Sequence, residues 1–175
     1  MEFQTLLSPF KAGRIEVKNR VVVLPHGAGF VRDGKVGEGE VGYYSNHAQG
    51  GVGLIITGGA IVHPTTRVTS AKLLEAYNEQ TIESMRTRCD EIHRHGAKIY
   101  GQILHLGRET AGQGDFGQAA VAPSAIRSPR DIYAPEALDH ETIRDIVKGF
   151  GVSAKNMIAG GYDGIEIHEI GRAHV

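Results

Sequence analysis

Apolar residues in this chain are concentrated in four short runs, and the segments between the runs carry apolar residues at helical spacing. The four runs are Val21–Leu24, Val52–Ala60, the stretch Gly96–Arg108 around Ile103, and Gly164–His168. Short runs rich in valine and isoleucine and bounded by glycine or proline predict strands. Because Val21–Leu24 has no polar position before Pro25 ends it, we expect this strand to be buried on both faces.

Helices are predicted between consecutive strands, over residues 38–49, 78–95 and 139–159. Asn78 can cap the second helix, which ends at Gly96. The third helix begins at an Asp139 cap, where Leu138 and Ile143 can form a hydrophobic staple. The apolar residues of this helix form one face, consisting of Ile143, Ile146, Val147, Phe150, Ala154, Met157 and Ile158.

Strands that alternate with helices predict parallel β/α units with right-handed crossovers. Ahead of the first strand, Leu6–Phe10 and Gly13–Arg20 flank a glycine turn and predict a small β-hairpin. The length favours an open doubly wound sheet, since a TIM (β/α)8 barrel typically needs about 250 residues. If the fold is a barrel, the chain supplies its N-terminal half, truncated after strand four.

A long segment, Glu109–Ala137, lies between the third strand and the third helix and is rich in glycine, proline, serine and aspartate. A segment of this length in a compact domain is usually a functional lid, a substrate-binding loop or disordered. We expect one of these three.

The composition is that of an ordinary globular protein, with 175 residues, 41% hydrophobic, 22% charged and a net charge of -1. This charge balance gives no electrostatic footprint for nucleic acid or an anionic membrane, so we expect neither as a partner. The start of the chain lacks a signal-peptide pattern, and no run is long enough to span a bilayer, which predicts a cytoplasmic protein. Cys89 lies in the apolar stripe of a predicted helix and is expected to be a core residue.

Ligands bind at the carboxyl ends of parallel strands in both architectures, so the residues there are the candidates for a site. These residues are Pro25, His26 and Gly27; Gly58, Gly59 and Ala60; Gln102, His105 and Arg108; and Glu166 and His168. Gln102 is an amide in an apolar setting, and burying it is costly without a partner. That partner is either backbone or a polar side chain of the protein, or the edge of a heterocyclic cofactor. Glu166 and His168 share a face of their strand.

Two alternatives compete with a site for a flat cofactor. His93 and His95, with His63 and His105, suggest a metal-dependent barrel hydrolase, although the first pair lies at the solvent-exposed end of a helix. The second alternative is a non-catalytic half-barrel that associates with itself or with a complementary half.

Several motifs, in order, resemble the Old Yellow Enzyme family of FMN-dependent oxidoreductases. They are Leu7–Phe10, Lys18–Val21, Gly50–Ile56, Gln102–Arg108, Val121–Ile126 and Gly161–His168. Within that family, Gln102–His105 and Ala122–Ala125 look most similar to the branch of 2,4-dienoyl-CoA reductase and trimethylamine dehydrogenase. Gly27 stands where trimethylamine dehydrogenase has the cysteine that tethers its flavin, so the resemblance implies non-covalent FMN.

The resemblance implies an FMN-bearing TIM barrel that uses NADH or NADPH to reduce activated C=C bonds of a small-molecule enone or dienoyl thioester, or that oxidises an amine. The implied cofactor-binding residues are Pro25, His26, Gly27, Gly59, Ala60 and Gln102, with Gln102 on the pyrimidine edge. His168 is the implied catalytic residue, which hydrogen-bonds the substrate carbonyl while the flavin delivers hydride. Whether the parent protein also carries an iron-sulfur cluster, and whether it is a homo-oligomer, stay open questions.

After His168 the chain departs from the family, which continues with a second hydrogen-bond donor. Residues 169–175 can be back-translated as GAGATCGGAAGAGCACACGTC, which contains a common sequencing-adapter sequence. We therefore expect one barrel domain over residues 1–168 and an artefactual tail over 169–175, so His174 is not taken as the second donor. Four strands cannot close a barrel, so the fragment itself is expected to expose strands one and four and to be inactive.

Overall fold

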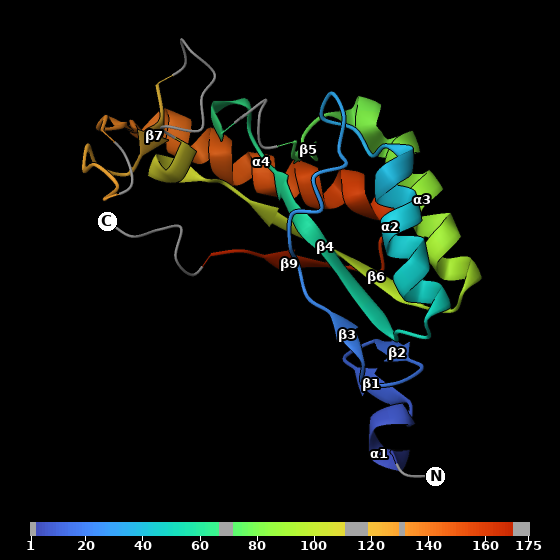
Figure 1. Ribbon diagram of the computed structural model, residues 1–175. Helices are drawn as coiled ribbons and strands as arrows, with labels where there is room; N and C mark the ends of the chain where they lie inside the picture. The colour runs from blue at the N-terminus through green and yellow to red at the C-terminus, as the bar shows by residue number, and fades with distance from the viewer. Residues whose placement is uncertain (1–2, 67–71, 111–118, 130–131, 170–175) are drawn as a thin grey trace.

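Four parallel strands form the central sheet, in the order β3-β4-β6-β9 (Figure 1). The computed structural model describes residues 3–66, 72–110, 119–129 and 132–169. The four strands are β3 (Val22–Val23), β4 (Leu54–Ile61), β6 (Lys98–Leu104) and β9 (Gly164–Ile167), and the short β5 (Leu74–Glu75) pairs with β4 beside this path. Each predicted strand is therefore present, paired with its neighbour in chain order.

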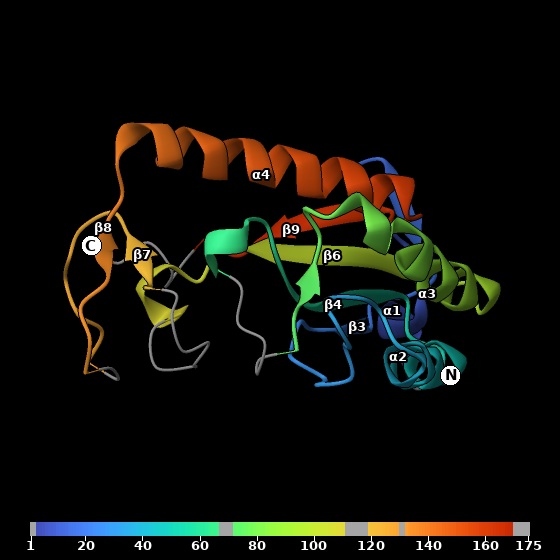
Figure 2. The same ribbon diagram turned by 90° about the horizontal axis from the view of Figure 1, so that it is seen from above.

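Three helices connect successive strands and cover one face of the sheet (Figures 1 and 2). They are α2 (Glu38–Gln49), α3 (Ile82–Arg94) and α4 (His140–Ala159). An open doubly wound sheet carries helices on both faces. With its helices on one face and its strands in sequential order, this chain has the arrangement of half a barrel.

The segment before β3 forms the predicted hairpin at the amino ends of the strands (Figure 1). It comprises α1 (Gln4–Leu7), β1 (Phe10–Ala12) and β2 (Ile15–Val17), with β1 and β2 antiparallel. Lys18 attaches it to the end of α3, because its Nζ donates to the His95 carbonyl oxygen at 2.7 Å.

The core lies between the sheet and the helices. Ile55 of β4 and Ile99 and Ile103 of β6 are buried against Met85 of α3 and Met157 of α4. Cys89 is part of the same core, as predicted, and burial raises the pKa of its thiol to about 12. Among the described residues, no helix is long and apolar enough to cross a membrane.

The Asp139 cap is confirmed, whereas Asn78 caps a short turn ahead of α3 rather than α3 itself, whose N-cap is Thr81. The Asn78 side chain accepts a hydrogen bond from the Gln80 N–H at a 3-10 turn, η3 (Glu79–Thr81), that leads into α3. Asp139 accepts from the Thr142 N–H at 2.7 Å at the start of α4. These bonds satisfy N–H groups that have no partner within the helix.

The prediction that Val21–Leu24 is buried on both faces is wrong. Val22 is 40% exposed and Leu24 is 69% exposed, because β3 is an edge strand and, among residues 3–66, 72–110, 119–129 and 132–169, pairs only with β4. The other edge is β9, where Ile167 is 61% exposed. The expectation that strands one and four form open apolar edges is confirmed.

The apolar face of α4 is buried only in part. Ile146 and Met157 are buried, whereas Val147 and Ile158 are more than half exposed. Helical periodicity identified the face, but burial also requires a partner along its whole width, and β9 is the last strand beside it.

The long segment Glu109–Ala137 contains short ordered elements. A 3-10 turn, η4 (Gly107–Thr110), begins it, and β7 (Val121–Ala122) pairs in parallel with β8 (Glu136–Ala137). A further 3-10 turn, η1 (Pro64–Thr66), follows β4. Residues 111–118 and 130–131 of this segment lie outside the described residues, so the expectation of a lid, a binding loop or a disordered segment stays a prediction.

Candidate functional site

The predicted site residues lie along one rim of the sheet. Pro25, His26 and Gly27 follow β3, Gly59 and Ala60 lie in the second half of β4, Gln102 lies in β6, and His168 follows β9 directly. Because these strands are parallel neighbours, their carboxyl ends meet at the same edge. The structure therefore brings together residues that are up to 143 positions apart, from Pro25 to His168.

The loop after β3 packs tightly against β4. A Cβ on Gly58 would collide with the carbonyl oxygen of His26, so only glycine allows this close approach. A Cβ on Gly27 would have no atom within 4 Å. Gly27 thus exposes open backbone beside the rim, against which a flat ligand can lie.

The His26 side chain is held on the side of α2. Its Nε2 hydrogen-bonds the Tyr43 hydroxyl, its Nδ1 lies 3.1 Å from the Leu24 carbonyl oxygen, and the two rings meet edge to face. With both ring nitrogens engaged, His26 can contribute its backbone to a ligand more readily than its ring. Tyr43 is a contact of the site that sequence reasoning missed, since nothing in the spacing links residue 26 to residue 43.

Ala60 contributes its side chain to the core. It is fully buried with Ile103 and Val62, beyond an irregularity in the β4–β6 pairing between Thr57 and Ala60. A cofactor at the rim could therefore meet Ala60 only through backbone.

Gln102 has a protein partner within the sheet. Its Nε2 donates to Glu166 Oε1 at 2.7 Å, and the two residues lie opposite each other in the β6–β9 register. Gln102 is only 8% exposed. Of the two partners expected for this amide, the polar side chain is confirmed, and this bond leaves a second N–H and the carbonyl oxygen of Gln102 for a ligand.

His168 is half-buried at the end of β9, on the same strand face as Glu166. Its Nδ1 is buried and has no hydrogen-bond partner among the described residues. A buried polar atom without a partner costs free energy, and a bound ligand can relieve that cost. His168 is therefore the best candidate of the rim for contacting a substrate.

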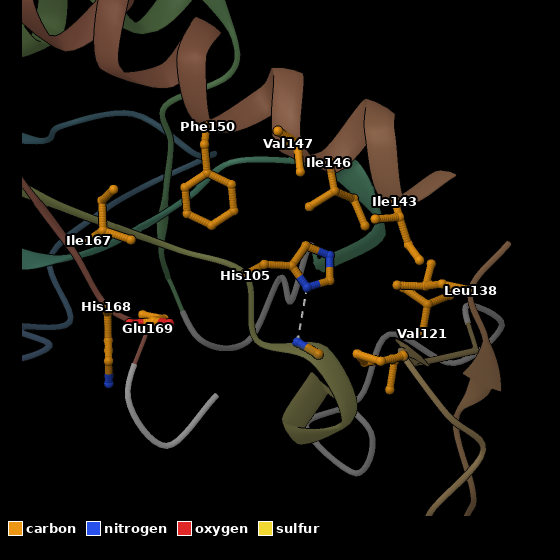
Figure 3. Close-up of a pocket in the computed structure, with 13 residues that line it drawn as sticks. His105, Val121, Leu138, Ile143, Ile146, Val147, Phe150, Ile167, His168 and Glu169 are labelled. Carbon is orange, nitrogen blue, oxygen red and sulfur yellow. Dashed lines mark hydrogen bonds between the residues drawn. The ribbon is translucent and has the colours of Figure 1, made fainter. Parts of the chain in front are cut away.

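An apolar pocket of about 260 Å³ lies outside the rim, between α4 and the ends of β6 and β9 (Figure 3). Ile146, Val147 and Phe150 of α4 line one side of it, and Ile167 lines another. His105 and His168 are the strand-end candidates among its lining, and Figure 3 shows the His168 ring directed away from α4. This pocket belongs to the incompletely covered face of α4 rather than to the rim.

A chain of hydrogen bonds runs between the loops after β4 and β6. His105 Nε2 lies 2.9 Å from Thr65 Oγ1, which lies 2.8 Å from His63 Nδ1, and His63 Nε2 lies 3.2 Å from Asp145 Oδ2. Burial, with a smaller effect of the nearby His63, lowers the pKa of His105 to about 4. His105 is thus a neutral ring that joins these loops to α4.

The four histidines of the metal hypothesis lie at two ends of the sheet. His63 and His105 follow β4 and β6, whereas His93 and His95 lie near the end of α3, bonded to Asp163 and Glu91. The part of the chain that the structure describes holds no group of three or more histidine, cysteine or acidic residues that could bind a metal ion.

The fold and the rim define the class of the protein, a half-barrel with a candidate ligand site at the carboxyl ends of its strands. A family model described as the NADH:flavin oxidoreductase / NADH oxidase family matches residues 5–171. The chain belongs to this family, the family of Old Yellow Enzyme. The match includes the first three residues of the predicted tail, of which Glu169 alone is described.

Two relatives show how much of a complete protein is present. A metal reductase from Desulforamulus reducens is 33% identical over 93% of this chain and 24% of its own length. A multifunctional alkene reductase/demethylase OYE from Caballeronia cordobensis is 31% identical over the same shares. The chain spans about a quarter of the length of these relatives.

A solved structure of a 2-naphthoyl-CoA reductase in complex with 2-naphthoyl-CoA is similar to this fold. It superimposes with a TM-score of 0.83 at 27% identity, over 94% of this chain and 27% of its own. The chain thus has the fold of half a TIM barrel of this family.

The residues at the rim fit an FMN ring. Gly27 offers open backbone, Gln102 is held with hydrogen-bonding groups to spare, and His168 has a buried nitrogen that needs a partner. Glu166 is the residue that sequence reasoning named without giving it a role. Strand parity placed it on the face of His168, but the register that sets it opposite Gln102 is a tertiary property.

Proposed function

We propose that the whole protein to which this chain belongs is an FMN-dependent, NAD(P)H-driven reductase of C=C bonds conjugated to a carbonyl group. In this proposal the chain supplies half of the FMN site. Family membership supports the flavin and the nicotinamide donor. The single observation that supports the substrate class is the Nδ1 of His168, which is buried and has no hydrogen-bond partner among the described residues. His168 directly follows the strand that pairs with the strand of Gln102.

Different residues at the rim would bind FMN and polarise the substrate carbonyl. FMN, when bound, supplies hydride transfer between the nicotinamide and the alkene. The backbone of Pro25, Gly27 and Gly59 would lie against the ring, and the Gln102 amide would hold one ring edge. His168 would donate a hydrogen bond to the carbonyl oxygen of the substrate, which stabilises the negative charge that develops there.

Oxidation of N-methyl amines is the second candidate function. It is favoured by the relative from Caballeronia cordobensis, whose name combines alkene reduction with demethylation. An amine has no carbonyl oxygen for His168 to polarise. The two functions should therefore respond differently to the loss of this side chain.

Within the family we propose the branch of 2,4-dienoyl-CoA reductase and trimethylamine dehydrogenase, with non-covalent FMN. The motifs Gln102–His105 and Ala122–Ala125 support the branch, and Gly27 supports the non-covalent cofactor. Acid precipitation of the complete protein should release all of its flavin. Iron and sulfide analysis of the same preparation tests for an iron-sulfur cluster.

The substitution His168→Ala in the complete protein tests the alkene function. Turnover of a cyclic enone with NADH or NADPH should fall by about 100-fold or more, the usual cost of removing a donor to a developing oxyanion. The visible absorption of bound flavin and any oxidation of an N-methyl amine should be retained. His140→Ala, at an exposed histidine that begins α4, is the matched control. Equal loss of both activities, or loss of neither, would contradict the proposal.

A further inference from the structure

The Glu166 side chain has one hydrogen-bond partner in the described part of the chain, and that partner is neutral. Its Oε1 accepts from Gln102 Nε2 at 2.7 Å, across the parallel pair of β6 and β9. No lysine, arginine or histidine of the described residues forms an ion pair with it. A half-buried carboxylate next to a buried amide is a costly way to hold two strands together, since a pair of apolar side chains would do so without desolvating a charge.

The carboxylate of Glu166 fixes the orientation of the Gln102 amide. The two ends of a glutamine amide are nearly equal in size, and either end can face a neutral partner. An ionised carboxylate only accepts hydrogen bonds, so the NH2 group must face Glu166. The carbonyl oxygen then faces β4, where Gln102 Oε1 lies 3.5 Å from the position of a Cβ on Gly59.

We propose that Glu166 is a positioning residue for the flavin and acts through Gln102; this inference rests on the proposed function. With its NH2 group held by Glu166, Gln102 presents one N–H and one carbonyl oxygen in a defined order along the rim. The pyrimidine edge of an isoalloxazine carries an N–H flanked by carbonyl oxygens. An amide of fixed orientation matches one donor and acceptor pair of that edge, whereas an amide free to flip matches it only part of the time.

The position of the neighbours supports this role. Gly59, toward which the carbonyl oxygen is turned, lines a small pocket together with His26 and Gly27. His168, the candidate contact for the substrate, follows Glu166 by two residues on the same strand face. Glu166 therefore lies between the amide that would bind the cofactor, Gln102, and the residue that would contact the substrate, His168.

The test uses the 175-residue chain labelled with 15N-glutamine, and FMN at up to millimolar concentration as the probe. In the unsubstituted chain the two side-chain N–H resonances of Gln102 should be well separated, because one proton is bound to a carboxylate. Glu166→Leu should bring them close to the values of a free glutamine and weaken FMN binding about ten-fold, which corresponds to about 1.4 kcal/mol. Glu166→Gln should fall between the two, since its carbonyl oxygen still accepts the bond.

Two controls separate positioning from charge and from packing. Glu169→Gln removes a carboxylate close to the rim that does not contact Gln102, and should change neither the Gln102 resonances nor FMN affinity. The double exchange Gln102→Glu with Glu166→Gln keeps a carboxylate and amide bond between the strands but leaves no N–H at position 102. It should retain the fold, measured by backbone spectra, and lose FMN affinity at least as much as Glu166→Leu.

The outcomes distinguish this inference from the proposed function. If Glu166→Leu leaves the Gln102 resonances and FMN affinity unchanged, Glu166 has no positioning role, although FMN binding itself would stand. If the Gln102 resonances depend on Glu166 but no residue at the rim responds to FMN, the proposed function is wrong and the inference falls with it.

Discussion

At the scale of single residues, Asp163 shows how one carboxylate can hold three segments together. It lies in the turn before β9 and accepts hydrogen bonds from Lys98 Nζ at 2.8 Å and the Ile99 N–H at 2.9 Å. His93 Nε2 at the end of α3 lies 2.7 Å away. The side chain is 13% exposed, so these bonds are only partly screened by water. Asp163 thus fixes the amino end of β6 between α3 and β9.

Asp163→Asn should destabilise the chain by about 2 kcal/mol, the usual range for hydrogen bonds to a charged group. Urea unfolding followed by circular dichroism measures the change. Asp90→Asn, at an exposed aspartate of α3, is the matched control and should stay within about 0.5 kcal/mol of the unsubstituted chain. A loss equal to that of the control would show that the Asp163 bonds contribute nothing.

The same residue predicts a dependence of stability on pH. Burial raises the pKa of Asp163, but hydrogen bonds from Lys98, the Ile99 N–H and His93 outweigh it, so the pKa lies below the ordinary value of 3.8. The native state then binds this proton less readily than the unfolded state. Its contribution to the free energy of unfolding is present above pH 3.8 and is lost as the pH falls through the native pKa. Asp163→Asn should flatten this part of the acid unfolding curve, whereas Asp90→Asn should not.

Residue types and strand positions listed the strand-end candidates, and the resemblance to Old Yellow Enzyme selected the cofactor and catalytic residues among them; neither gave the internal contacts. Gln102 and His168 were candidates because they lie near the carboxyl ends of predicted strands, and both lie on the rim. The bond between Gln102 and Glu166 depends on the register of β6 against β9, and the bond between His26 and Tyr43 depends on the packing of a loop against α2. Neither follows from local sequence, because each joins positions whose separation along the chain carries no periodic signal.

At the scale of secondary structure, the spacing of apolar residues predicted the longer helices and strands. Residues 38–49 form a helix as predicted, and α4 begins at its Asp139 cap. The pairing of β7 with β8 was missed, because a strand of two residues has no period to recognise. Burial of Val21–Leu24 was predicted wrongly, because the sequence of a strand does not tell whether a neighbour is present on both sides.

The contact between the β3 loop and β4 gives a prediction at this scale. Gly58→Ala should push the backbone of His26 away from β4 and destabilise the chain by about 2 kcal/mol, as overpacking against backbone does. Gly42→Ala is the matched control, since Gly42 lies inside α2 with no atom within 4 Å of an added Cβ. That substitution should stabilise by about 0.5 to 1 kcal/mol through helix propensity. Thermal unfolding of both variants checks the opposite signs.

At the scale of the whole molecule, the two open edges are the main physical feature. Within the described parts of the chain, β3 and β9 each lack a paired strand on one side, and Leu24 and Ile167 beside these edges are exposed. An eight-stranded barrel has no such edges. The four parallel strands of this chain make half of one, and the metal reductase it resembles is about four times as long, which agrees with a site that is completed by further strands.

The central claim is that the carboxyl-end rim of this half-barrel is the ring-binding half of an FMN site. Backbone 1H–15N spectra of the 175-residue chain, recorded during a titration with FMN, test it most directly. We expect weak binding with shifts that cluster at Gly27, Gly59, Gln102 and His168, and none at the hairpin near Phe10 or at the end of α3 near His93. No shift at the rim at millimolar FMN, or shifts centred on the amino ends of the strands, would contradict the account.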